Sequence, residues 1–296
     1  MFTLPVVDMM DPAATTVISK ACKDHGFFYL ENHGVSGEMI QHVFDQSKGF
    51  FNLDSEVKMT VKRDVDTGYS PMGKDITNKA NPYKVETKES FIIRNEAGTS
   101  RREPNQWPVE TLVPGWKVTM TEYFNTMQSL AERVTDLLAV SFGVDPSIFR
   151  GFMAERLCSL RLLHYSSQVS DPPKGVIGIG ERSDFGMLTL LATDDVPGLQ
   201  VLVNDEWFDI PPRSGAFICN LGDMIQRWTN DHMRSTVHRV VNKLGRERYS
   251  IPFFYAPSFD SKVECLPQFC SEDDPAKYPP TTSGKYLMEK LSGLCS

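Results

Sequence analysis

Closely spaced cysteines are the first thing that this sequence lacks. Its six cysteines form no CxxC pair and are scattered along the chain, at Cys22, Cys158, Cys219, Cys265, Cys270 and Cys295. In a chain of 296 residues such scatter argues against a disulfide framework and indicates reduced thiols. We therefore expect a cytoplasmic protein.

Long apolar runs and an excess of positive charge are also missing. No apolar run has the length that spanning a bilayer requires, and the N-terminal stretch "MFTLPVVDMMDPAATT" lacks the basic and apolar segments of a secretory signal. The formal net charge of -7 argues against nucleic acid as the main partner, because phosphate binding needs clustered lysine and arginine. We expect a soluble monomer with no membrane partner and no nucleic-acid partner.

The chain does have an ordinary globular composition, with 41% hydrophobic and 23% charged residues, and it is long enough to bury a sizeable core. Its first part alternates between extended and helical patterns, with strands expected at 4–9 and 26–34, helices at 12–25 and 37–51, and a short helix opened by Asp54 and Ser55. Residues 62–115 look irregular, interrupted by one strand at 89–95. From 116 to 142 apolar residues recur every three or four positions, which predicts the longest helix.

After Leu157 the pattern changes to about eight short strands, separated by turn sequences such as "DDVPG" and "PPRSG". The strands read "SLRLLHY", "VIGIG", "DFGMLTLLAT", "LQVLV", "EWFDI", "GAFICNL", "STVHRVV" and "RYSIPFFY". The expected fold is mainly β with helices: a double-stranded β-helix, or jelly roll, with a helical N-terminal part. We expect four segments, namely an N-terminal region (1–115), a long supporting helix (116–150), the jelly-roll core (151–260) and a C-terminal tail (261–296).

Two residues of this β-core point to metal chemistry. Asp184 lies two residues after Arg182, so on one strand both side chains would point to the same face. His238 lies on another predicted strand, "STVHRVV". Two nitrogens and one oxygen from opposing strands, with coordination positions left open, form the arrangement that suits Fe(II) in oxygenases, and Asp184 and His238 supply one oxygen and one nitrogen of it.

Arg248 and Ser250 share one face of a later strand, "RYSIPFF". The planar fork of an arginine grips a carboxylate through two hydrogen bonds, and a neighbouring hydroxyl adds a third. Burying an arginine in such an apolar stretch is costly without an anionic partner. This pair therefore predicts a dicarboxylate ligand, held here at its far end while its near end reaches the metal.

Taken together, these stretches resemble the plant-type iron(II)/2-oxoglutarate-dependent dioxygenases, the family that includes flavonoid, gibberellin and tropane alkaloid oxygenases and isopenicillin N synthase. The motifs "LPVVDM" and "CKDHGFFYLENHGV" are similar to its N-terminal domain, and its core is matched, in order, by "RLLHYS", "SDFGMLTLLATDDVPGLQV", "GAFICNLGDMIQRWTN", "STVHRVV" and "ERYSIPFFY". The resemblance covers nearly the whole chain.

The resemblance implies an oxidoreductase, a dioxygenase with the cofactors 2-oxoglutarate and Fe(II) and a small-molecule substrate. By the same resemblance, Asp184 and His238 match metal ligands. Arg248 and Ser250 match the residues that bind the distal carboxylate of 2-oxoglutarate, and Tyr165 matches a position near this co-substrate.

Arg182 departs from the pattern of that family, which has histidine at this position, in the order His-x-Asp. Arginine stays protonated and only donates hydrogen bonds, so it offers no lone pair to iron. Its guanidinium is expected to form a bidentate pair with Asp184 and so neutralise the carboxylate that a metal needs. Glu181 is no substitute, because strand alternation points it to the opposite face. We therefore expect an impaired iron site.

Three functions stay open at this point. The first is hydroxylation or desaturation of a small specialised metabolite by a 2-oxoglutarate-dependent oxygenase with a weakened iron site. The second is a metal-independent, non-oxidative step in the same pocket, with Arg182 as the catalytic residue that stabilises a developing anion and Arg248 as a carboxylate anchor. The third is binding of 2-oxoglutarate or another carboxylate without catalysis.

Overall fold

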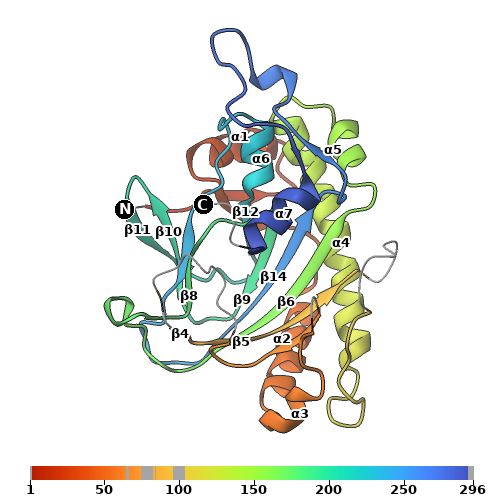
Figure 1. Ribbon diagram of the computed structural model, residues 1–296, viewed down its shortest axis with the longest axis vertical. Coiled ribbons are helices and arrows are strands. Elements are labelled where there is room, and N and C mark those ends of the chain that lie inside the picture. Colours follow the sequence, from red (N-terminus) through yellow and green to blue (C-terminus); the bar gives the residue numbers. More distant parts are fainter. Residues whose placement is uncertain (1, 65–66, 75–82, 84, 96–103, 293–296) are drawn as a thin grey trace.

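The computed structural model of the chain describes residues 2–64, 67–74, 83, 85–95 and 104–292 (Figure 1). The helices of these ranges are α1 (Ala14–Asp24), α2 (Gly37–Phe51), α3 (Ser55–Met59), α4 (Trp116–Ser141), α5 (Pro146–Phe152), α6 (Asp223–Trp228) and α7 (Ser283–Ser292). Within the same ranges, no helix combines the length and the apolar character that crossing a membrane requires.

The strands are short and most of them lie in the second half of the chain. They are β1 (Val6–Asp8), β2 (Phe27–Glu31), β3 (Gly68–Ser70), β4 (Val85–Glu86), β5 (Lys88–Arg94), β6 (Leu157–Tyr165), β7 (Val176–Ile177), β8 (Ile179–Arg182), β9 (Leu188–Thr193), β10 (Leu199–Val203), β11 (Glu206–Ile210), β12 (Phe217–Leu221), β13 (His238–Val240), β14 (Arg248–Ala256), β15 (Lys262–Val263) and β16 (Thr281–Thr282).

Two sheets pack face to face and enclose the space in which the predicted site residues meet. The larger sheet has the order β1-β2-β12-β9-β14-β6-β5-β3, so strands from the N-terminal region extend it at both edges. The smaller sheet has the order β11-β10-β13-β8. Apolar residues join the two layers, among them Leu163 and Tyr165 from the larger sheet with Ile179 and Val240 from the smaller one. This is the jelly-roll architecture that the sequence predicts.

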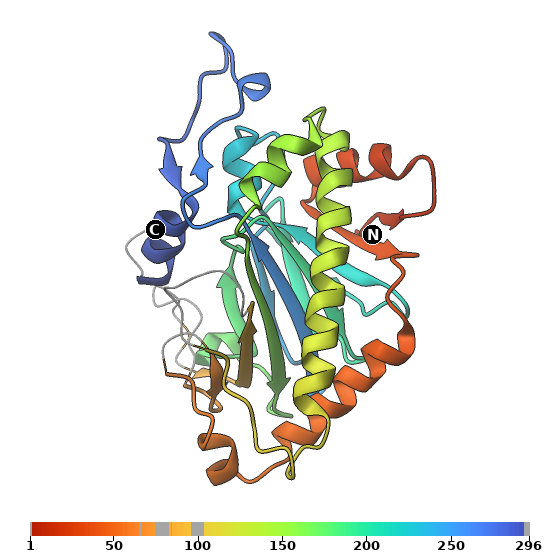
Figure 2. The same cartoon turned by 90° about the vertical axis from the view of Figure 1, so that its right-hand side faces the viewer.

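Helix α4 covers the face of the larger sheet that points away from the smaller sheet (Figure 2). It starts after Gly115, whose φ of 76° lies in the left-handed region that favours glycine. Its buried residues recur every three or four positions, and one of them, Phe124, packs edge-on against Phe253 of β14 with ring centroids 5.2 Å apart. The helix predicted for 116–142 is therefore confirmed, because a long apolar stripe is the clearest helical signal in a sequence.

The region 62–115 holds more regular structure than the sequence predicts. Besides β5, which confirms the strand expected at 89–95, the described residues form β3 and β4. Strand β3 pairs with β5, and β4 pairs with β7 in a small sheet of its own. The expectation of a single strand here is wrong, because strands of two or three residues carry no alternating pattern and are stabilised by their partners.

Candidate functional site

Asp184 lies beyond the end of β8, which stops at Arg182. Its Oδ2 accepts hydrogen bonds from the Thr189 hydroxyl at 2.6 Å and from the Asn220 side-chain amide at 2.7 Å. Its backbone carbonyl accepts the amide of Asp223 at 2.8 Å. The prediction that Asp184 continues the strand of Arg182 is therefore wrong, because bonds to β9, β12 and α6 hold this residue outside the β-ladder.

His238 opens β13 and faces Asp184. Its Nε2 lies 3.5 Å from Asp184 Oδ1, and its Nδ1 lies 3.0 Å from the carbonyl oxygen of Thr236. Donation from Nδ1–H to this carbonyl leaves the lone pair on Nε2, as in metal-binding histidines. Neighbouring ligands with bonds of about 2.1 Å lie about 3.0 to 3.4 Å apart. At 3.5 Å, His238 Nε2 and Asp184 Oδ1 lie just beyond this range, which is close to the separation of two ligands of one ion.

The Asp184 carboxylate is kept ionised in this buried position. Burial alone disfavours its charge, but the neighbouring His238 and Arg182 and the hydrogen bond from Asn220 together hold the pKa of Asp184 well below its usual range. A cation site requires a carboxylate of this kind.

Arg182 lies directly opposite His238 in the antiparallel pair of β8 and β13, so both side chains emerge on the same face of the smaller sheet. Its Nη1 donates to the Gly180 carbonyl at 3.3 Å. In the described part of the chain it forms no ion pair with Asp184, so the expected bidentate pair is wrong. The reason is that both Asp184 oxygens are already engaged, one by two uncharged donors and the other by His238.

No other side chain among the described residues completes the metal site. Glu181 points to the outer face of the smaller sheet, as expected, where it accepts hydrogen bonds from Arg239 and Tyr83 at 3.1 Å each. His164 points away from the site and binds Glu89 at 2.7 Å. Within the ranges that the structure describes, no three His, Cys, Asp or Glu side chains are grouped to hold a metal ion. The donor set found there offers two ligands and does not fit the three-ligand iron site.

A second cluster, formed by Arg248, Ser250 and Tyr165, fits the far carboxylate of a dicarboxylate. Tyr165 at the end of β6 lies opposite Arg248, with the guanidinium carbon 4.9 Å from the ring centroid. The Ser250 hydroxyl donates to the Tyr165 hydroxyl at 3.3 Å. Arg248 is 2% exposed; its Nε donates to the Val196 carbonyl at 3.2 Å, but its Nη1 is buried without a hydrogen-bond partner. A buried guanidinium with an unused donor fits an anion.

The charge of Arg248 influences the pKa of Asp194, but the two side chains form no ion pair. Burial raises the pKa of Asp194, and the charge of Arg248 only partly offsets this effect. Asp194 instead accepts the backbone amides of Tyr249 at 2.6 Å and Val196 at 3.1 Å. No carboxylate among the described residues therefore forms an ion pair with Arg248.

Three residues that support the site are missed by the sequence reasoning: Thr189, Asn220 and Asp223. The first two are polar residues inside largely apolar strands, "LTLLAT" and "FICNL". A polar residue in such a run must find a buried partner, and this is the signal that identifies them. Asp223 accepts the hydroxyls of Ser235 at 2.6 Å and Tyr286 at 2.7 Å, and so ties α7 to the segment of Asp184. No sequence signal predicts this contact.

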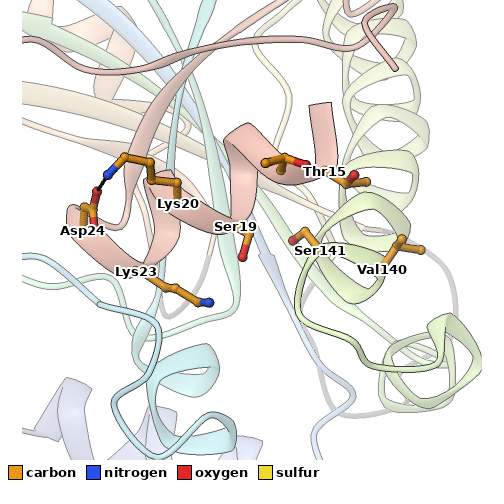
Figure 3. A pocket seen from close by; sticks show the side chains of 8 residues that line it. Thr15, Ser19, Lys20, Lys23, Asp24, Val140 and Ser141 are labelled. Atoms are coloured by element: carbon orange, nitrogen blue, oxygen red, sulfur yellow. Dashed lines mark hydrogen bonds and ion pairs between the residues drawn. The ribbon is translucent and has the colours of Figure 1, made fainter. Parts of the chain in front are cut away.

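A surface groove of about 520 Å³ lies away from these residues, between α1 and the end of α4 (Figure 3). Hydroxyls and two lysines line it, and one of them, Lys20, is paired with Asp24. None of the predicted site residues borders this groove.

Comparison with known proteins identifies the family. The 2OG-Fe(II) oxygenase superfamily matches residues 157–257, and the N-terminal region of non-haem dioxygenases in morphine synthesis matches residues 4–110. The 2-oxoglutarate-Fe(II) type oxidoreductase hxnY of Emericella nidulans is 36% identical over 283 residues, which cover 90% of this chain and 80% of that protein. Kihadalactone A synthase LFS of Citrus sinensis is 32% identical over 315 residues, 100% of this chain and 93% of that protein.

Solved structures agree with the sequence matches. The crystal structure of a full-length Neurospora crassa protein in complex with alpha-KG (2-oxoglutarate) has a TM-score of 0.88 at 32% identity and covers 98% of this chain and 96% of that one. A structure of JOX2 contains 2OG, Fe and JA. These findings confirm the expected jelly-roll fold, the oxidoreductase class, and 2-oxoglutarate and Fe(II) as the cofactors of the family. The chain belongs to the 2OG-Fe(II) oxygenase superfamily.

Proposed function

We propose that this protein is a 2-oxoglutarate-dependent oxygenase that hydroxylates or desaturates a small specialised metabolite and has an impaired iron site. The observation that carries the proposal is the buried Arg248 guanidinium, whose unpartnered Nη1 lies in a cluster with Ser250 and Tyr165. Relatives support a small-molecule substrate: one is named kihadalactone A synthase, and the similar Neurospora crassa protein has been crystallised with thymine.

In this proposal the residues divide the work between two ends of the ligand. Arg248 grips the distal carboxylate of 2-oxoglutarate through two hydrogen bonds, Ser250 adds a third, and the Tyr165 ring lies against the guanidinium. Asp184 and His238 hold the metal at the other end. A two-residue site binds metal more weakly than one with three ligands, and the positive charge of Arg182 weakens it further.

A second candidate function rests on Arg182 itself. A fixed cation beside Asp184 and His238 stabilises a developing anion without a metal, which suits a non-oxidative step in the same pocket. Binding of 2-oxoglutarate or another carboxylate without catalysis uses the same residues.

We also propose that the protein works as a cytoplasmic monomer without membrane or nucleic-acid partners, and that the chain divides into the segments 1–115, 116–150, 151–260 and 261–296. The net charge of -7 supports the absence of a nucleic-acid partner. The described cysteines are free thiols, which supports a reducing compartment.

Anaerobic calorimetric titration with Mn(II), an inert stand-in for Fe(II), tests the main proposal with and without 2-oxoglutarate. We expect weak Mn(II) binding to the unaltered protein, and Mn(II) binding at least tenfold tighter in Arg182→His. Equal Mn(II) affinity of the two proteins contradicts the impaired site. In Arg248→Gln we expect loss of 2-oxoglutarate binding, whereas the exposed Arg246→Gln is the matched control. If Arg248→Gln binds 2-oxoglutarate normally, the co-substrate site is wrong.

A further inference from the structure

Arg182 has more hydrogen-bonding capacity than the protein uses. A guanidinium carries five N–H donors, and within the described residues Arg182 uses one of them, to the Gly180 carbonyl at 3.3 Å. This bond is long for an N–H···O contact, and it goes to a neutral acceptor two residues away. Arg182 is partly exposed, so its remaining donors are open to a ligand.

The charge of Arg182 has no counter-ion of its own among the described residues. The adjacent carboxylate, Glu181, is drawn to the outer face of the sheet by Arg239 and Tyr83. Asp184 contributes its negative charge at longer range, but its two oxygens are taken by other partners. Arg182 is therefore a cation on β8, next to the position that a metal would take, and no described carboxylate contacts it.

Another cation near Asp184, Lys290, does have a counter-ion within the protein. Lys290 of α7 lies 5.9 Å from the ring centroid of Phe185, next to Asp184. Its Nζ is 3.9 Å from the Asp223 carboxylate, so it has a counter-ion within the protein. Arg182 and Arg248 differ from it, because neither forms an ion pair in the described part of the chain.

The two arginines face the same enclosed space from opposite sheets. Arg248 points inward from β14 of the larger sheet, and Arg182 emerges beside His238 on β8 of the smaller sheet. Contacts of Tyr165 with Ile179 and Val240 close the layers next to Arg248. A ligand held at its far end by Arg248 therefore has its near end directed toward His238, Asp184 and Arg182.

We propose that Arg182 binds the 2-oxo acid end of 2-oxoglutarate directly, so that this chain holds the dicarboxylate between two arginines without a metal. The proposal rests on the proposed function, which assigns the far carboxylate to Arg248. The guanidinium of Arg182 supplies the positive charge that a metal supplies in a three-ligand site, and its fork matches a carboxylate. Arg182 is then the residue that makes co-substrate binding independent of metal, rather than a defect.

Calorimetric titration of the full chain with 2-oxoglutarate, in EDTA and separately in Mn(II), tests this directly. For the unaltered protein we expect dissociation constants within threefold of each other in the two buffers. Arg182→Gln removes the charge but keeps a polar side chain, and we expect binding in EDTA to weaken at least tenfold. Arg182→His is expected to lose binding in EDTA and to regain it in Mn(II). Thermal unfolding of each variant and the control Arg246→Gln exclude general damage.

The possible failures separate the two proposals. Binding of 2-oxoglutarate that needs Mn(II) in the unaltered protein, or that is unchanged in Arg182→Gln, overturns the role of Arg182 and leaves the Arg248 site standing. Metal-free binding that is unchanged in Arg248→Gln but lost in Arg182→Gln overturns the Arg248 site instead. No binding of 2-oxoglutarate in either buffer overturns both. Glutarate lacks the 2-oxo group but keeps both carboxylates. We expect its dissociation constant in EDTA to lie within tenfold of that of 2-oxoglutarate, because the Arg182 guanidinium binds the carboxylate. Much weaker binding of glutarate contradicts a contact between Arg182 and the carboxylate.

Discussion

Arg248 lies against Tyr165, with its guanidinium carbon 4.9 Å from the ring centroid, and its Nε donates a hydrogen bond to the Val196 carbonyl. The cation–π contact and this bond leave Nη1 buried and unpaired. A buried charge without a partner costs stability. Proteins keep such a destabilising residue where a ligand binds to the charge.

Replacing Arg248 by methionine is therefore expected to stabilise the ligand-free protein. Methionine keeps much of the packing against Tyr165 and removes the buried charge, so we expect a gain of about 1 to 3 kcal/mol in the free energy of unfolding. Binding of 2-oxoglutarate is expected to be lost at the same time. Urea denaturation without ligand measures the first effect and calorimetry the second. Loss of stability in Arg248→Met contradicts the view that Arg248 is kept for a ligand.

The hydrogen bond from Thr189 to Asp184 is expected to tune the metal site. Thr189→Val removes the hydroxyl that donates to Oδ2 at 2.6 Å while keeping the shape of the side chain. Loss of such a supporting bond costs about 10- to 100-fold in metal affinity. The measurement is Mn(II) titration in an Arg182→His background, where three ligands are available, against Arg182→His alone. The outer-face variant Thr126→Val on α4, whose hydroxyl donates to its own helix, is the control. Unchanged affinity in Thr189→Val means that this bond does not orient Asp184.

The sequence predicts those parts of the fold and the site that depend on local periodicity. The spacing of Arg248 and Ser250 on one strand is confirmed, because alternation along a strand is a local property. Tyr165 lies opposite Arg248 because of the register in which β6 pairs with β14. The sequences of the two strands do not specify this register. The family resemblance, rather than a spacing rule, identified Tyr165.

The placement of Asp184 and Arg182 shows where local rules fail. Alternation predicts both side chains on one strand and in contact with each other. Tertiary bonds from Thr189 and Asn220 decide the outcome instead, and they come from residues 5 and 36 positions away along the chain. Local patterns contain no information on such competing partners, so the expected pair between Arg182 and Asp184 is not formed.

Glu89 is expected to make stability depend on pH. It is 4% exposed and accepts hydrogen bonds from Lys58 at 2.9 Å, Tyr69 at 2.5 Å and His164 at 2.7 Å. Burial opposes its charge, but the bonds from His164, Lys58 and Tyr69 outweigh burial and bring the pKa of Glu89 below its ordinary value of 4.5. A carboxylate with a lowered folded pKa stabilises fully above its unfolded pKa, and this contribution is lost as pH falls through the folded pKa.

Glu89→Gln tests this network. At pH 7 we expect the variant to be less stable than the unaltered protein by about 3 kcal/mol, because it leaves Lys58 buried without its counter-ion. The difference is expected to narrow as pH falls below 4.5, where the carboxyl of the unfolded chain begins to protonate. Urea denaturation at several pH values between about 7 and about 3.5 measures it. A difference that is constant over this range assigns the effect to packing rather than to charge.

The segment that carries Asp184 passes closely over Gly222, and this contact gives a steric prediction. A Cβ at Gly222 would lie 2.3 Å from the Gly186 carbonyl oxygen and 2.9 Å from that of Asp184. These are backbone atoms, which cannot rotate away, so Gly222→Ala must displace the segment and is expected to cost about 3 kcal/mol or more. Because the displaced segment holds Asp184, Mn(II) affinity is expected to fall as well. Gly151→Ala is the matched control: its Cβ meets nothing within 4 Å on α5, and a gain of about 0.5 to 1 kcal/mol is expected there. Urea denaturation measures the stability of both variants. If Gly222→Ala is as stable as the unaltered protein, the Asp184 segment moves at little cost, and its close contact with Gly222 does not fix its position.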